Sequence, residues 1–171
     1  MNFLLNFRLL VIALWLGAAC FFSFAVAPSA FAVLPSRELA GSVVSRTLSI
    51  VNYAGLAIGL ILLLSSFVKR PQTGRLWLLA ERFSLLILTV ACAVGQFVIG
   101  LWLAYIRSFI NRPIDELAAD DPLRMQFNNL HQYSVWVLLA AMIAALVSFF
   151  IMAQNSRRNE TINIKPDVKY N

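Results

Sequence analysis

Residues Leu9 to Gly41 read LLVIALWLGAACFFSFAVAPSAFAVLPSRELAG, and the stretch is uncharged as far as Ser36. An α-helix needs about 20 apolar residues to cross a hydrocarbon core about 30 Å thick, so the stretch is long enough to span a membrane once. Leu34-Pro35-Ser36 then predicts a corner, because proline does not continue a helix and serine is a favoured N-cap for the next one. The sequence therefore predicts a membrane helix, a tight corner and a second helix that runs back.

The rest of the chain contains further long apolar runs. Of its 171 residues, 60% are hydrophobic and 13% are charged, whereas soluble domains average about 45–50% and about 25%. We therefore predict an all-α polytopic membrane protein, a four-helix transmembrane bundle in the inner (plasma) membrane. The predicted membrane domain covers residues 1–153, with helices at about 9–33, 37–68, 76–110 and 122–153, and residues 154–171 are predicted to form a polar, disordered cytoplasmic tail.

The charged residues lie in the connections and at the ends of the chain, and their distribution predicts the orientation. If the basic turn at 69–75 marks one side of the membrane, both termini share that side, which carries the whole net charge of +6. On the other side the arginines and the acidic residues balance. Basic residues concentrate on the cytoplasmic side of membrane proteins, so we expect both termini in the cytoplasm.

A cleaved signal peptide is the alternative for the first helix. Ala30-Phe31-Ala32 has the A-x-A form of a cleavage site, and Arg8 stands where a signal peptide has its basic region. The apolar run from Leu9 to Ala27, however, is longer than the roughly 7–15 residues of a signal peptide's apolar region. Pro28 should end or kink the helix near Ala27. We expect the first helix to be retained.

Small residues spaced four apart predict close packing of helices. Ala13 and Gly17 form such a pair on the first helix, and Gly55 and Gly59 form a GxxxG motif on the second. Trp15 lies too deep to be an interfacial anchor, and we interpret it as a packing residue. Beyond the lipid bilayer, the expected partners are a second copy of the chain or another membrane protein that packs against small-residue helix faces.

Polar residues inside apolar runs should face other helices, because exposing them to lipid is costly. Four of them, from three different helices, are candidates for an outward-opening polar cleft: Arg46, Asn52, Gln96 and His131. Hydrogen bonding between helices is the more common role for such residues. A functional cleft is the alternative interpretation.

The sequence contains no recognisable catalytic or cofactor-binding motif. His131 is the only histidine, which excludes a bis-histidine haem within one chain, and the two cysteines, Cys20 and Cys92, lie in apolar runs without metal-ligand spacing. We find no Ser-His-Asp order, phosphate-binding loop or zinc-protease motif. We expect no catalytic residues, no metal site, no cofactor and no nucleic-acid partner.

Several short motifs of the chain are distinctive. They are Leu14-Trp15-Leu16-Gly17, Phe21-Phe22, Ala27-Pro28, Phe31, Leu34-Pro35 and Ala40-Gly41 in the first hairpin, and Leu130-His131-Gln132-Tyr133-Ser134 at the start of the last helix. These motifs resemble the transmembrane protein 205-like family. The resemblance implies a small four-helix integral membrane domain, in bacteria usually of unknown function. It also implies that Pro28, Pro35, Gly41 and His131 matter for the shared structure.

These observations favour a non-enzymatic membrane component with a structural, regulatory or transport-accessory role. One alternative is an oligomeric protein through which small solutes or ions permeate by way of the polar cleft. Glycine faces turned away from the bundle would favour it. A second alternative is a membrane metal-handling protein, against which the single histidine argues.

Overall fold

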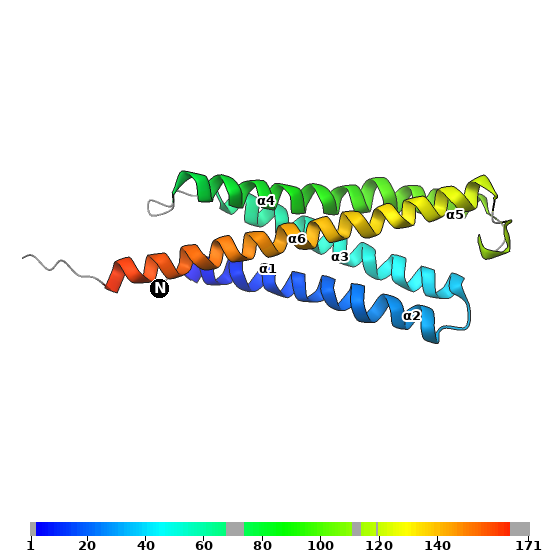
Figure 1. The fold of residues 1–171 in the computed structure, drawn as a ribbon, viewed down its shortest axis with the longest axis horizontal. Helices are drawn as coiled ribbons and strands as arrows, with labels where there is room; N and C mark the ends of the chain where they lie inside the picture. Colours follow the sequence, from blue (N-terminus) through cyan, green and yellow to red (C-terminus); the bar gives the residue numbers. More distant parts are fainter. Residues whose placement is uncertain (1–2, 68–73, 111–113, 119, 165–171) are drawn as a thin grey trace, which may run out of the picture.

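The computed structural model describes residues 3–67, 74–110, 114–118 and 120–164, and this part of the chain is helical without strands. Four segments are long and apolar enough to span a membrane: Phe3–Val33, Arg37–Ser65, Arg75–Phe109 and Pro122–Asn155. They run back and forth beside one another as an elongated bundle (Figure 1). The predicted fold class and the four membrane helices are confirmed, and the first helix begins earlier and the last one ends later than predicted.

Two of the four segments contain a π-helical turn. The first consists of α1 (Phe3–Phe21), η1 (Phe22–Val26) and α2 (Ala27–Val33), and the third of α4 (Arg75–Ala93), η2 (Val94–Gly100) and α5 (Leu101–Phe109). In the first, the Ala27 N–H donates to the Phe22 carbonyl, a hydrogen bond five residues back, directly before Pro28. Proline lacks an N–H, and its ring clashes with the carbonyl four residues earlier in a regular helix. The wider π turn therefore accommodates Pro28, and the helix continues through it instead of ending.

The corner forms as the sequence predicts. Leu34 precedes Pro35 and is extended, with φ −75° and ψ 142°, as residues before proline prefer. The Ser36 hydroxyl accepts a hydrogen bond from the Leu39 N–H at 3.2 Å and so caps α3 (Arg37–Ser65). The corner places the end of α2 and the first turn of α3 at the same end of the bundle.

The last helix, α6 (Pro122–Ile164), continues past its predicted end at residue 153. It begins where predicted, because Asp121 Oδ1 accepts a hydrogen bond from the Leu123 N–H at 2.8 Å. Polarity does not mark its end, since Asn155 is only 8% exposed and still packs inside the bundle. Extending a formed helix adds one hydrogen bond per residue, so the polar sequence after residue 153 remains helical. Residues 165–171 of the predicted tail lie outside the described residues.

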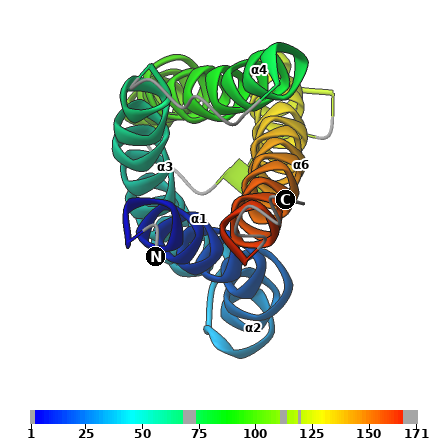
Figure 2. The same cartoon turned by 90° about the vertical axis from the view of Figure 1, so that its left-hand side faces the viewer.

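The four segments form a ring in the order α1, α3, α4 and α6 (Figure 2). Gly55 and Gly59 of α3 are buried where α1 and α4 approach. A Cβ on Gly55 would lie 2.6 Å from Cys92 Sγ and 2.7 Å from Trp15 Nε1, and one on Gly59 would lie 2.5 Å from Thr89 Oγ1. The predicted close packing at the GxxxG motif is confirmed, and these glycines face inward.

Trp15 and its neighbours decide which face of α1 is buried. Trp15 is 3% exposed and donates from Nε1 to the Val51 carbonyl at 2.9 Å, which confirms its packing role. Gly17 is exposed, with no atom within 4 Å of the position that a Cβ would take, and Ala13 is also exposed. Within the bundle, the predicted close approach at this small-residue pair is therefore wrong. Bulky Trp15 anchors the inner face instead and turns the small pair outward.

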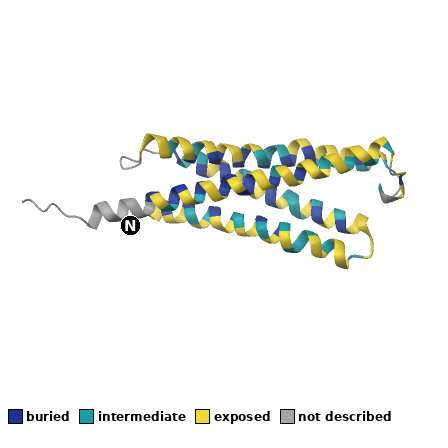
Figure 3. Cartoon of the chain, viewed as in Figure 1, coloured by how far each residue is buried: buried dark blue, intermediate teal, exposed yellow. Residues whose placement is uncertain are grey.

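Exposed residues run along the outside of every segment (Figure 3), and many of them are large apolar residues, as are those of the core. Phe24, Val33 and Leu76 are 77–80% exposed. Soluble monomers rarely expose contiguous apolar patches larger than a few hundred Å². The exterior is therefore suited to contact with lipid chains, as a multi-pass membrane protein requires.

Candidate functional site

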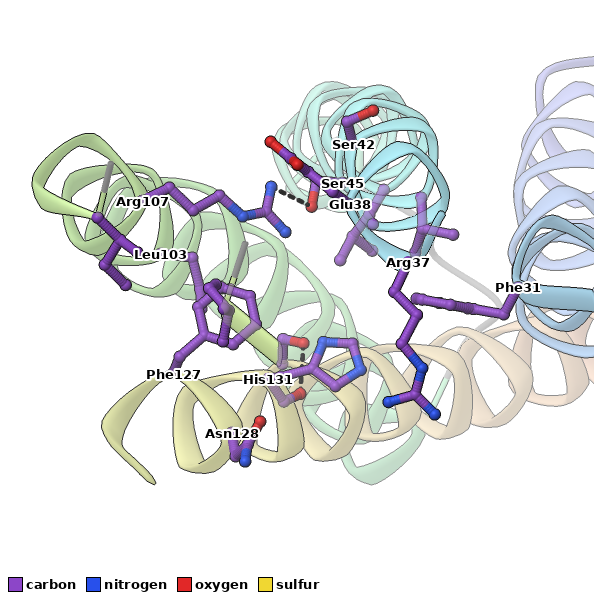
Figure 4. Close-up of a pocket in the computed structure, with 16 residues that line it drawn as sticks. Phe31, Arg37, Glu38, Ser42, Ser45, Leu103, Arg107, Phe127, Asn128 and His131 are labelled. Carbon is purple, nitrogen blue, oxygen red and sulfur yellow. Dashed lines mark hydrogen bonds between the residues drawn. The ribbon is translucent and has the colours of Figure 1, made fainter. Parts of the chain in front are cut away.

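A polar pocket opens at the end of the bundle that holds the corner, where α2, α3, α5 and α6 meet (Figure 4). We call it the corner pocket. Its volume is about 390 Å³, within the range of roughly 300–1,000 Å³ typical of small-ligand sites. Its polar lining comes from Arg37, Glu38, Ser42 and Ser45 of α3, Arg107 of α5, and Asn128, His131 and Ser134 of α6.

Arg107 is held inside this pocket by groups from two other helices. Its Nη1 donates to Ser45 Oγ at 3.2 Å, its guanidinium lies 5.2 Å from the centroid of the Phe127 ring, and it interacts electrostatically with Glu38. Gly41 leaves the space that the guanidinium occupies, since a Cβ there would lie 3.3 Å from Nη2. The glycine of the corner motif therefore makes room for the arginine.

Arg37 and His131 line the pocket from opposite helices. Arg37 projects from α3 towards α6, and His131 projects from α6 towards α3, with the Phe31 ring beside them (Figure 4). His131 is exposed, so it lies at the rim, and it interacts electrostatically with Arg107. The pocket thus combines two guanidinium groups and an imidazole with the carboxylate of Glu38.

The hydroxyl groups of this donor set are engaged in hydrogen bonds. The Ser42 hydroxyl donates to the Leu39 carbonyl at 2.8 Å, and the Ser45 hydroxyl accepts from Arg107. Neither serine bonds to the His131 ring in the part of the chain that the structure describes. Among those same residues, no group of three or more His, Cys, Asp or Glu side chains could hold a metal ion. Arginine forks recognise planar oxyanions, so the chemistry available is the binding of an anionic group.

The four residues predicted to form a polar cleft do not meet at one place. His131 lines the corner pocket, whereas Arg46 is exposed and lies outside the lining. Asn52 and Gln96 are buried, at 4% and 8% exposed, one to two turns deeper than the pocket's lining residues on their helices. The Asn52 amide packs against Gly95, 3.0 Å from where a Cβ would be. Neither buried amide side chain points into lipid, and Asn52 belongs to the contact between α3 and η2.

Sequence reasoning did not assign Arg37 and Glu38 to the candidate site. Each stands at the edge of an apolar run, where a charge is ordinarily read as an orientation signal. Their position at the same end of the bundle as Arg107 could have been inferred, because the corner places the start of α3 at the end of the bundle where α5 finishes. Which of these charges faces inward is decided by the rotation of each helix.

A buried ion pair lies at the opposite end of the bundle. Arg8 Nη2 is 2.8 Å from Glu81 Oε1, and the two side chains are 1% and 0% exposed. The same nitrogen donates to the Leu62 carbonyl at 2.9 Å, so the pair joins α1, α3 and α4. The prediction that Arg8 precedes the first helix is wrong, because α1 begins at Phe3 and Arg8 faces the core from within it. Arg8 and Glu81 carry opposite charges and belong to the same side, so their pairing leaves the net charge of that side at +6.

Residues 10–108 match a family described as a domain of unknown function (DUF4149). The match runs from α1 to the last residues of α5 and covers more than half of the chain. The chain belongs to the DUF4149 family. The DUF4149 match contains Gly41, Ser45 and Arg107, whereas His131 on α6 lies beyond it. No curated protein and no solved structure matches this DUF4149 chain. Membership is consistent with a small membrane domain whose activity is unknown.

Proposed function

We propose that this DUF4149 protein is a non-enzymatic membrane component whose structural, regulatory or transport-accessory role is exercised through the corner pocket. The observation that carries the proposal is that the pocket is blind. Beyond its lining, the interior is filled by side chains such as Trp15, Leu88, Cys92 and Ala145, which are 0–3% exposed. The far end is closed by the pair between Arg8 and Glu81. A blind pocket binds a ligand or a partner group but does not conduct.

The engaged serines and the arginine-rich lining support a non-enzymatic role. The donors converge on space that an anion would fill. Among the described residues, the Ser45 hydroxyl is hydrogen-bonded to Arg107 and not to a general base. An acyl-transfer site needs a nucleophile within hydrogen-bond reach of its base. The lining of the corner pocket therefore favours binding over turnover.

The charge distribution supports an inner-membrane protein with both termini in the cytoplasm. The first described residues and the end of α6 lie at the same end of the bundle (Figure 1), on the side to which the sequence assigns the net charge of +6. Basic residues favour the cytoplasmic side. In this orientation the corner pocket opens on the outer face of the membrane.

A finer family assignment follows from the first hairpin and the last helix. We place the chain with the transmembrane protein 205-like proteins on the motifs quoted above. Two contacts give residues of these motifs a structural role: Gly41 accommodates Arg107, and the Ser134 hydroxyl donates to the His131 carbonyl at 2.6 Å in the wall of the pocket.

Permeation is the competing function, and the glycine packing argues against it. The GxxxG face that would favour a permeation path between subunits is used inside the bundle, at Gly55 and Gly59. The small-residue face that does turn outward is the pair Ala13 and Gly17 of α1. The test is to reconstitute the purified protein in liposomes that contain entrapped K⁺, Cl⁻ or a small neutral solute. We expect release no faster than from protein-free liposomes, with a pore-forming peptide as the positive control. Saturable release that Arg107→Gln abolishes would overturn the proposal.

A further inference from the structure

Two amide side chains lie near the middle of the membrane-spanning segments. Asn52 stands near the centre of Arg37–Ser65, and Gln96 stands near the centre of Arg75–Phe109. They are 4% and 8% exposed. In the part of the chain that the structure describes, neither side chain makes a hydrogen bond to another protein group. Buried polar groups are normally hydrogen-bonded to protein or to ordered water, and in a membrane the cost of leaving them unbonded is high.

These two amides differ from the polar atoms that the bundle seals completely. Arg8 Nε and Nη1, Ser148 Oγ and Asn155 Nδ2 have no partner among the described residues and almost no accessible surface. The amide atoms of Asn52 and Gln96 do not belong to that sealed group. They are enclosed by the bundle, yet they retain surface that a molecule the size of water can touch.

Gly95 makes room beside the Asn52 amide. Nδ2 and Oδ1 of Asn52 lie 3.0 and 3.5 Å from the position that a Cβ on Gly95 would take, so the amide faces the backbone of η2. Gln96 is the next residue of the same π turn, and its Cα is about 3.8 Å from that of Gly95. The two amides therefore belong to one small region of the interior, at a π turn, a feature frequent at functional sites.

The surroundings of the amides favour a small, neutral occupant. Amides carry no charge, and Arg107 stands eleven positions after Gln96, about 16 Å along the helix axis. Arg46, the nearest charged residue on α3, is exposed. An amide offers both donors and an acceptor, and water, which also donates and accepts, commonly satisfies such buried groups with about three hydrogen bonds.

We propose that Asn52 and Gln96 bind internal water near the centre of the bundle, one to two turns deeper than the corner pocket. This water completes the hydrogen bonds of both amides and joins α3 to the π turn of η2. By holding η2 it also positions α5, the helix that carries Arg107. The inference is independent of what the corner pocket binds.

Cys92 is a natural probe of this water. It stands one turn before Gln96, and its Sγ lies 2.6 Å from the position that a Cβ on Gly55 would take, one turn after Asn52. Cys92 is a free thiol and is only 1% exposed. Bulk water therefore does not reach it, and oxidation by radicals formed from water requires a water molecule inside the bundle.

Met152 of α6 is the matched dry reference. It is also a sulfur side chain, it is 0% exposed, and it stands between Ser148 and Asn155, whose unpartnered polar atoms are sealed. Both thiols and thioethers react with hydroxyl radicals close to the diffusion limit. A difference between Cys92 and Met152 in oxidation rate therefore reports nearby water and not intrinsic reactivity.

The test is X-ray radiolytic footprinting of the full chain in lipid nanodiscs. A short X-ray pulse converts bulk and bound water into hydroxyl radicals, and mass spectrometry measures the oxidised fraction of each residue against an unirradiated sample. We expect Cys92 to be oxidised at least about fivefold faster than Met152, because buried water next to it supplies the radicals. Equal resistance of Cys92 and Met152 would overturn the inference.

Asn52→Leu and Gln96→Met each remove one amide and keep a side chain of similar size. In either variant, if its circular dichroism spectrum is unchanged, oxidation of Cys92 should fall at least about threefold, since buried water needs several polar partners. Asn155→Leu is the matched control: it removes a sealed amide with the same 8% exposure as Gln96, and it should change Cys92 oxidation less than about twofold, because distant sites act independently.

Two results with these variants would overturn the inference. One is unchanged oxidation of Cys92 in the folded Asn52→Leu and Gln96→Met proteins. The other is an equal fall in Asn155→Leu, which would show that the oxidation does not depend on the two amides. If neither amide variant folds, the comparison of Cys92 with Met152 in the wild type still decides. Solute release from liposomes, in contrast, bears on the proposed function alone.

Discussion

Glu81→Gln should destabilise the protein far more than replacing both partners of the buried ion pair. In the native structure, Arg8 Nη2 lies 2.8 Å from Glu81 Oε1 and 2.9 Å from the Leu62 carbonyl oxygen. Removing the carboxylate leaves a guanidinium that is 1% exposed without a counter-charge. Breaking a buried pair by removing one partner costs about 3–5 kcal/mol.

Replacing both charges should be neutral or favourable. Arg8→Met together with Glu81→Leu keeps the volumes similar, and such exchanges are often neutral or stabilising by about 1–4 kcal/mol. Nε and Nη1 of Arg8 have no partner among the described residues, so the native pair is incompletely satisfied. We therefore expect the double variant on the stabilising side.

The assay is reversible unfolding in mixed micelles with a rising fraction of sodium dodecyl sulfate, followed by far-ultraviolet circular dichroism. The wild type, Arg8→Met, Glu81→Leu and the double variant form a cycle that isolates the coupling of the two side chains, and Glu81→Gln is measured beside it. Arg75→Met is the matched control, because Arg75 is an exposed arginine of the same helix as Glu81, and it should change the free energy of unfolding by less than about 0.5 kcal/mol. The reasoning is refuted if Glu81→Gln resembles this control, or if the double variant loses the sum of the two single losses.

Three further predictions concern packing, processing and topology. Gly55→Ala places a methyl group 2.6 Å from Cys92 Sγ and should lower the free energy of unfolding by about 1–3 kcal/mol. Gly17→Ala meets no atom within 4 Å and should raise it by up to about 1 kcal/mol, because alanine is the better helix former; equal losses in the same unfolding assay would contradict the packing. The intact mass of the purified protein should include the first helix, and a form that begins at Val33 would show that it is cleaved. Reporter fusions at the C-terminus and within the 114–118 segment should report opposite sides of the membrane, with the C-terminus cytoplasmic; periplasmic activity at the C-terminus would reverse the topology.

Local sequence signals predicted the elements and several of their ends. The Leu34-Pro35-Ser36 corner acts through φ restriction and a side-chain cap, which depend on residues next to one another. The start of α6 at Asp121-Pro122 has the same local cause. Its end was misjudged because the polarity of Asn155 was taken as exposure to water, and the structure shows that residue packed inside the bundle.

The composition of the candidate site could be predicted only in part. His131 was chosen because it is a polar residue near an apolar run, and it does line the corner pocket. Arg46 was chosen for the same reason, yet it is exposed outside the pocket. Nine positions before it on the same helix, Arg37 does line the pocket. The rotation of α3 about its axis separates the two arginines, and no property of either residue alone fixes that rotation.

The sequence by itself determined that this protein is built for a lipid bilayer and that it has four segments able to span it. The reason is that apolar length and turn chemistry are properties of consecutive residues. Only the tertiary structure decided which charges are buried and which converge. Arg8 and Glu81 are far apart in sequence and pair across α1 and α4, and Arg107 reaches Ser45 across α5 and α3. The physical reason is that burial of an ionisable group depends on a partner supplied by another helix. In this bundle that partner is placed by the packing of Trp15 and Gly55, which sets how close the helices lie and which face each one turns inward.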